Sequence, residues 1–141
     1  MDKLSKALYT AEASVTGGRA GHAISSDGLL SLDLRVPEAM GGPGGGTNPE
    51  QLFAVGYAAC FQSALAGVGR RRSIDTSASM ITSRVSIGTI GNGRYGLAVE
   101  LKISIPGVEA GVARELVEEA HQVCPYSNAT RGNIEVKLSV G

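Results

Sequence analysis

The chain has 141 residues, 43% of them hydrophobic, and its 13 Lys and Arg balance 13 Asp and Glu. A chain of this length is expected to form one domain, residues 1–141. A net charge of zero argues against a nucleic-acid partner, because binding to a phosphate backbone requires a basic surface.

The first 15 residues contain no apolar stretch long enough for the core of a signal peptide. We also expect no segment to approach the roughly 20 apolar residues of a transmembrane helix. The sequence therefore predicts a cytoplasmic protein without membrane contact. In a reducing cytosol, a disulfide is expected to be transient rather than structural.

Short strands are expected in the first third of the chain. Residues 8–16 and 29–36 show alternating polarity, and residues 22–25 begin a returning strand between them. The turn at 17–21 contains three glycines and Arg19. These features predict a small antiparallel sheet with an arginine in one of its turns.

A long helix is expected from about residue 49 to residue 70. It follows a glycine-rich loop at 41–47 that lacks the Gly-Lys-Ser/Thr of a phosphate-binding loop. Asn48 suits the N-cap, Pro49 the first helical position and Glu50 the first turn. Ala and Gly dominate the helix middle. Because Gly costs about 1 kcal/mol relative to Ala inside a helix, we expect another backbone to approach closely there.

The second half predicts two strands, a helix and a last strand. The strands are residues 76–89 and 95–105, the helix spans 112–124, and residues 134–138 alternate again. Pro125 is expected to end or kink the helix at the residue before it. The fold class predicted is α+β, with antiparallel sheets around two central helices.

Cys60 and Cys124 are the only two cysteines and lie 64 positions apart. Two buried inert residues and a redox couple both agree with this spacing. A thiolate is the reactive form, and Cys60 in mid-helix gains little from the helix dipole, so it needs a cation such as an arginine. The C-terminal end of a helix disfavours a thiolate at Cys124. If the pair is functional, Cys60 attacks and Cys124 follows.

Two sequence blocks, NPEQLFAVGYAACFQSAL and HQVCPYSNATRGNIEV, closely resemble the organic hydroperoxide resistance proteins, a branch of the OsmC family. The GGRAGHA turn and the GGPGGGTNPEQ loop share this resemblance, which spans essentially the whole chain. The resemblance implies an OsmC-like fold and a reactive triad of Arg19, Glu50 and Cys60. It implies that Cys124 resolves the oxidised Cys60.

The activity implied is that of a thiol-dependent peroxidase. The Cys60 thiolate would attack an organic hydroperoxide, and its sulfenic acid would condense with Cys124 to form a disulfide. Arg19 would hold the thiolate, and Glu50 would orient Arg19 through a charge-assisted pair. The resemblance implies a dihydrolipoyl-bearing protein or small dithiol as reductant, and no metal, haem or flavin is needed.

The spacing of Glu50 and Cys60 predicts a second chain at the site. Ten residues of helix separate them by about 15 Å and turn their side chains roughly 80° apart. An antiparallel pair of these helices, with a two-fold axis near Val55, would bring Glu50 of one chain to Cys60 of the other. We therefore expect an intertwined homodimer with two composite sites.

Five apolar or aromatic side chains near Cys60 and Cys124 are candidates for an apolar substrate channel, or alternatively belong to the core. An aliphatic channel would favour bulky alkyl or fatty-acid hydroperoxides over hydrogen peroxide. These candidates are Leu52, Phe53, Tyr57, Phe61 and Tyr126.

Three other functions remain open. A metal-binding module would use Cys60, Cys124, His121 and His22, although no CxxC pattern supports it. A redox sensor would form the same disulfide without efficient turnover. An osmotically induced relative would share the fold with a weaker preference for peroxides.

Overall fold

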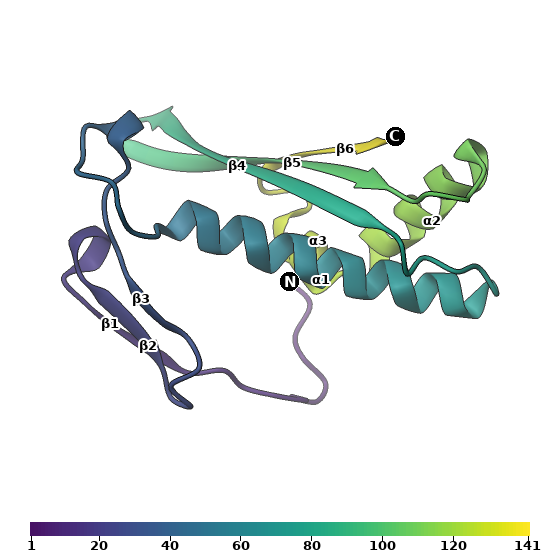
Figure 1. The fold of residues 1–141 in the computed structure, drawn as a ribbon, viewed down its shortest axis with the longest axis horizontal. Coiled ribbons are helices and arrows are strands. Elements are labelled where there is room, and N and C mark those ends of the chain that lie inside the picture. Colours follow the sequence, from purple (N-terminus) through teal and green to yellow (C-terminus); the bar gives the residue numbers. More distant parts are fainter. The chain divides into compact units, whose positions relative to one another are not determined.

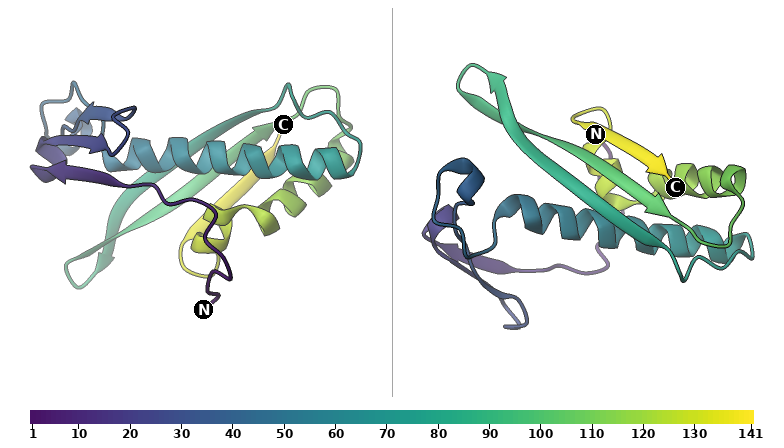
Figure 2. Two further views of the ribbon diagram at one scale, coloured as in Figure 1. Left: turned by 90° about the horizontal axis from the view of Figure 1, so that it is seen from below. Right: turned by 45° about the horizontal axis from the view of Figure 1, so that its top comes forward.

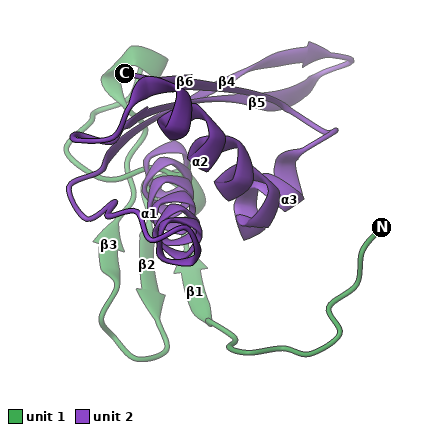
Figure 3. Cartoon of the chain, turned by 90° about the vertical axis from the view of Figure 1, so that its right-hand side faces the viewer, with its two compact units in different colours: residues 1–49 green, residues 50–141 purple.

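Two three-stranded sheets organise the computed structural model, which describes all residues from 1 to 141. Contacts between Cα atoms divide the chain into two units, residues 1–49 and 50–141, coloured separately in Figure 3. Each unit holds one of the two sheets. The predicted α+β class is confirmed, and the single domain stays a prediction.

The sheet of the first unit is antiparallel, with the order β1-β2-β3 (Figure 1). Its strands are β1 (Ala13–Thr16), β2 (His22–Ser25) and β3 (Ser31–Asp33). The strands predicted at 8–16 and 29–36 are therefore shorter than expected. Pairing explains the length, because β2 offers only four residues as partners for β1.

A tight turn between β1 and β2 carries Arg19. Gly17 and Gly18 have φ angles of 76° and 56°, in the left-handed region that glycine adopts at least cost. They lead into η1 (Gly18–Ala20), a single 3₁₀ turn. A second such turn, η2 (Glu38–Met40), precedes the glycine-rich loop. The glycines around Arg19 thus fix the backbone that presents its side chain.

The second unit places helices against one face of a sheet (Figures 1 and 2). The sheet has the order β4-β5-β6, and α1 runs along it. Its elements are α1 (Pro49–Arg71), β4 (Met80–Gly91), β5 (Arg94–Ser104), α2 (Ala110–Val123), α3 (Pro125–Thr130) and β6 (Glu135–Val140).

One detail of the predicted topology is corrected. β4 and β5 pair antiparallel, as expected, but β5 and β6 pair parallel. The chain between β5 and β6 forms α2 and α3, and a helical crossover of this kind returns the chain in its original direction. The sheet is therefore mixed.

The core of the second unit forms around one stripe of α1. Tyr57, Phe61 and Leu65 follow one another at four-residue spacing, and all three are fully buried. This spacing keeps side chains on one helix face. They pack with Leu101 on β5 and Leu116 on α2 in a single apolar cluster.

The expectation that no segment has the length and composition of a transmembrane helix is wrong for α1. Its 23 residues include an 18-residue window with a mean hydropathy of 1.5, and 28% of that window is buried. The core helix of a soluble fold has the same composition, and the stripe at Tyr57, Phe61 and Leu65 packs in that way.

Gly69→Ala is expected to destabilise the protein by about 1–3 kcal/mol, because it overpacks the contact between α1 and the following segment. A Cβ atom at residue 69 would lie 2.8 Å from the backbone oxygen of Ile74 and 2.8 Å from Cγ2 of Thr76. Gly67→Ala is the matched control, because its nearest neighbour would be an Arg70 side-chain nitrogen at 3.8 Å. The control should gain up to about 1 kcal/mol of helix propensity. If the urea unfolding midpoints of both variants shift in the same direction, overpacking at residue 69 is contradicted.

Candidate active site

The two cysteines meet in the second unit. The Cys124 Sγ donates a hydrogen bond to the Cys60 Sγ across 3.5 Å, and both are free thiols. Cys60 is half-buried in the middle of α1, and Cys124 is fully buried between α2 and α3. The fold thus brings together two thiols that lie 64 positions apart.

A backbone kink positions Cys124. Its φ and ψ angles of −64° and 123° are extended, so α2 ends at Val123. The predicted end of the helix before Pro125 is confirmed, and α3 then begins at Pro125 itself. The prediction missed α3, although a proline at the first helical position was a signal for it.

The surroundings of Cys60 favour the thiol over the thiolate. Burial is the main cause and raises the pKa of Cys60, and the hydrogen bond and charge of Cys124 raise it further. The backbone N–H of Tyr126 hydrogen-bonds to Cys60 and acts in the opposite direction. Nucleophilic attack by Cys60 near neutral pH therefore requires an added positive charge.

The two charged residues of the predicted triad lie in different units. Arg19 is in η1 of the first unit, and Glu50 is in the first turn of α1 at the start of the second. Both residues take part in interactions. Their roles beside Cys60 stay predictions.

Aromatic side chains gather next to the cysteines. The ring of Tyr126 lies 5.8 Å from that of Phe53 and 5.7 Å from that of Tyr57, measured between centroids. Gly56 leaves room for this ring, because a Cβ there would lie 2.9 Å from the Tyr126 hydroxyl. Tyr126 remains 38% exposed, so this aromatic group is partly open to solvent.

The other candidates for the substrate channel differ in exposure. Leu52 and Phe53 are half-buried, whereas Tyr57 and Phe61 are fully buried in the core. A contact of Phe61 with substrate would require the core to open. Substrate contact stays a prediction for all five residues.

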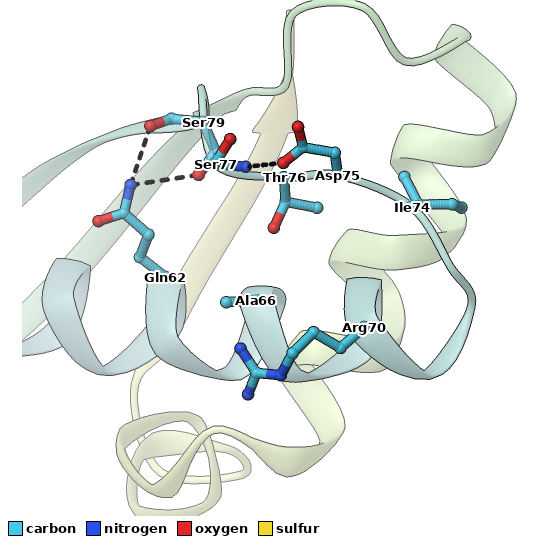
Figure 4. A pocket seen from close by; sticks show the side chains of 8 residues that line it. All are labelled: Gln62, Ala66, Arg70, Ile74, Asp75, Thr76, Ser77 and Ser79. Atoms are coloured by element: carbon cyan, nitrogen blue, oxygen red, sulfur yellow. Dashed lines mark hydrogen bonds between the residues drawn. The ribbon is translucent and has the colours of Figure 1, made fainter.

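A separate pocket of about 370 Å³ lies elsewhere on α1 (Figure 4). Gln62 follows Cys60 by two residues, which places it about 200° around the helix. Its amide donates to the backbone oxygen of Ser79 at 2.9 Å. The lining residues are Gln62, Ala66, Arg70, Ile74, Asp75, Thr76, Ser77 and Ser79. This pocket therefore includes neither cysteine.

The histidines considered as metal ligands have other partners. The His22 ring contacts Asp33 Oδ1 and Ser31 Oγ, each at 3.0 Å, within the first unit. The His121 Nδ1 lies 2.8 Å from Ser127 Oγ. No group of three or more His, Cys, Asp or Glu side chains has the geometry to hold a metal ion.

Known proteins resemble this chain over nearly its whole length. The sequence model of the OsmC-like protein family matches residues 42–139. An organic hydroperoxide resistance protein of Xanthomonas axonopodis pv. citri is 53% identical over 137 residues, which cover 96% of each chain. The organic hydroperoxide resistance protein OhrB of Bacillus subtilis is 45% identical and covers 95% of this chain and 98% of its own.

Solved structures give the same result. An organic hydroperoxide resistance protein from Legionella pneumophila matches with a TM-score of 0.92 and 51% identity, covering 96% of this chain and 99% of its own. One from Vibrio cholerae, with captopril bound in one of its active sites, matches with a TM-score of 0.95 and 47% identity. That match covers 99% of this chain and 96% of the other.

Proposed function

The chain belongs to the OsmC-like protein family, in its organic hydroperoxide resistance branch, and on that basis we propose that it is a cysteine peroxidase for organic hydroperoxides. The observation that carries the proposal is the pair of free thiols with sulfurs 3.5 Å apart. A disulfide needs about 2.05 Å between the same atoms, so a movement of about 1.5 Å closes the bond.

In the first step, the Cys60 thiolate attacks the terminal oxygen of the hydroperoxide. The O–O bond breaks, the alkoxide takes up a proton and leaves as an alcohol, and Cys60 becomes a sulfenic acid. The half-buried position of Cys60 supports this assignment, because a peroxide can reach it more easily than the fully buried Cys124.

In the second step, the Cys124 sulfur attacks the sulfenic sulfur of Cys60. The S–S bond forms, the S–O bond breaks, and the leaving hydroxide combines with the thiol proton as water. A dithiol then reduces the disulfide by exchange and is itself oxidised to a disulfide. We expect dihydrolipoyl groups or another small dithiol in this role. The chemistry requires no metal or organic cofactor, and the reducing cytoplasm is its expected location.

Arg19 supplies the positive charge that the thiol pair lacks, and Glu50 orients Arg19. The pKa of Cys60 is raised by burial, and a guanidinium beside the sulfur would lower it and stabilise charge on the breaking O–O bond. Glu50 would fix the guanidinium by a bidentate ion pair. The left-handed glycines that frame Arg19 support a defined position for its backbone.

The active site is proposed to be shared by two chains in an intertwined homodimer. α1 is one continuous helix of 23 residues, so the axial separation of Glu50 and Cys60 remains about 15 Å. Val55, midway between them, is 70% exposed. With Ala and Gly residues around it, the exposed Val55 leaves the centre of α1 accessible for the proposed contact with a second helix.

Mixing two inactive variants should restore activity if the site is composite. A chain with Glu50→Gln lacks the acid, and a chain with Cys60→Ser lacks the nucleophile. Their heterodimer contains one complete site, so equal mixing and reassociation should give about a quarter of the wild-type sites. Each variant alone is the control. A mixture no more active than its parents, or a fully active monomer by sedimentation, would refute the shared site.

Steady-state consumption of cumene hydroperoxide tests the proposed activity. We expect turnover with dihydrolipoamide and little with glutathione, because a dithiol completes the exchange within one molecule. Hydrogen peroxide should be consumed more slowly, given the aromatic surroundings at Phe53, Tyr57 and Tyr126. One oxidation without turnover would instead favour a redox sensor, and absence of both oxidation and turnover would overturn the proposal.

A further inference from the structure

A buried hydrogen-bond network spans the kink that contains Cys124. Ser127 Oγ lies 2.8 Å from His121 Nδ1 and 2.8 Å from the hydroxyl of Tyr57. His121 lies on α2, three residues before Cys124, and Ser127 lies on α3, three residues after it. Ser127 and Tyr57 are fully buried. One serine hydroxyl therefore joins α1, α2 and α3 around the second thiol.

Each hydroxyl has only one proton to donate, so the donors and acceptors of this network can be assigned. Thr130 Oγ1 contacts the Ser127 backbone oxygen at 3.3 Å and the Tyr57 hydroxyl at 3.2 Å. A carbonyl oxygen only accepts, so Thr130 donates to it. Tyr57 must then donate to Thr130, and Ser127 to Tyr57. All four contacts are satisfied only if His121 donates from Nδ1, which leaves Nε2 without a proton when the ring is neutral.

A second contact crosses the same kink. The guanidinium of Arg131, at the end of α3, donates to the backbone oxygen of His121. The same guanidinium donates to Asn128 Oδ1 at 2.8 Å. Both the ring and the backbone of His121 are thus bound to residues on the far side of Cys124. These contacts fix the angle between α2 and α3.

We propose that His121 is a positioning residue, which acts through Ser127 and Tyr57 to hold Cys124 within reach of the oxidised Cys60. The inference rests on the proposed function and concerns its second step only. In that step the S–O bond of Cys60 and the S–H bond of Cys124 break, while the S–S bond and water form. The 3.5 Å between the sulfurs is the distance that the network maintains. Loss of the network lets α3 move and slows closure of the disulfide.

Two substitutions of His121 distinguish the effect of its hydrogen bond to Ser127 from the effect of losing the imidazole ring. Asn places an amide nitrogen where Nδ1 stands and can still donate to Ser127, whereas the Gln amide reaches toward the position of Nε2. After one equivalent of cumene hydroperoxide, we expect His121→Gln to form the Cys60–Cys124 disulfide about tenfold more slowly, the effect of losing one ordinary hydrogen bond. Sulfenic acid formation should be unchanged, and His121→Asn should resemble the wild type. Gln122→Ala, an exposed neighbour on α2, is the control.

A second experiment forms the Cys60–Cys124 disulfide with oxidised dithiothreitol, so that the test of His121 does not depend on a reaction with peroxide. The mixed disulfide at Cys60 is also resolved by Cys124, so the same order of rates is expected even if the wild type fails to react with hydroperoxide. Equal rates in wild type and His121→Gln, or equal slowing in the Gln and Asn variants, would overturn the positioning role. Heteronuclear NMR of the neutral His121 ring should find the proton on Nδ1. A proton on Nε2 would overturn the network's direction.

Discussion

Cys60→Ser is expected to reduce hydroperoxide consumption to the rate of buffer alone. A serine hydroxyl is not ionised at neutral pH and cannot attack the O–O bond, so the first step has no nucleophile. Cys124→Ser should behave differently, because Cys60 is intact. It should react with about one equivalent of hydroperoxide and accumulate the Cys60 sulfenic acid, which excess peroxide drives to the sulfinic acid. Peroxide consumption assays and mass spectra of both variants measure these outcomes.

The comparison of Cys60→Ser with Cys124→Ser decides which thiol attacks the hydroperoxide. Loss of the first reaction in Cys124→Ser but not in Cys60→Ser would reverse the roles of the thiols. Equal residual activity in both would remove the cysteines from the mechanism. Circular dichroism of each variant checks that the fold persists, which matters most for the fully buried Cys124.

Arg19→Met is expected to slow sulfenic acid formation by about 10²–10³-fold, the usual cost of removing one group that stabilises developing charge. The substitution should also raise the pKa of Cys60, measured from the pH–rate profile. Burial already raises this pKa, and the guanidinium would lower it by favouring the thiolate, so removal of the guanidinium raises it again. Stopped-flow measurements with cumene hydroperoxide between neutral and alkaline pH record both effects.

Two control variants distinguish the role of Arg19 at Cys60 from a general effect of removing one positive charge. Arg94→Met, at the exposed start of β5, removes the same charge elsewhere and should leave the rate unchanged. Arg19→Lys keeps a charge but loses the planar fork that pairs with a carboxylate, so it should recover only part of the rate. A pH–rate profile that does not move in Arg19→Met would remove Arg19 from the activation of Cys60.

Much of the fold follows from local patterns in the sequence. Asn48, Pro49 and Glu50 predicted the start of α1, which is confirmed. The buried stripe of Tyr57, Phe61 and Leu65 was not predicted, although its four-residue spacing is a local signal. Strand ends were less accurate, because the length of β1 is set by the short partner β2 rather than by its own residues. The parallel pairing of β5 and β6 depends on a crossover, which local alternation does not encode.

In the candidate site, too, some features follow from local sequence and others depend on tertiary packing. The kink before Pro125 was predictable from proline geometry, and the pairing of Cys60 with Cys124 was a hypothesis that chemistry and family resemblance suggested. The hydrogen bond from the Tyr126 N–H to Cys60 was not predictable, because backbone donors carry no sequence signal. The buried hydrogen bonds of Ser127 were missed for a similar reason. A buried serine resembles an exposed one until the elements around it are packed.

In the proposed function, Cys60 and Cys124 act as one two-electron couple toward organic hydroperoxides. The most direct measurement adds one equivalent of cumene hydroperoxide to the reduced protein, counts free thiols and alcohol, and maps disulfides by peptide mass. We predict that both thiols disappear, that one equivalent of alcohol forms, and that the peptides of Cys60 and Cys124 are joined. Survival of both thiols, with the hydroperoxide unconsumed, would contradict this role of the two cysteines.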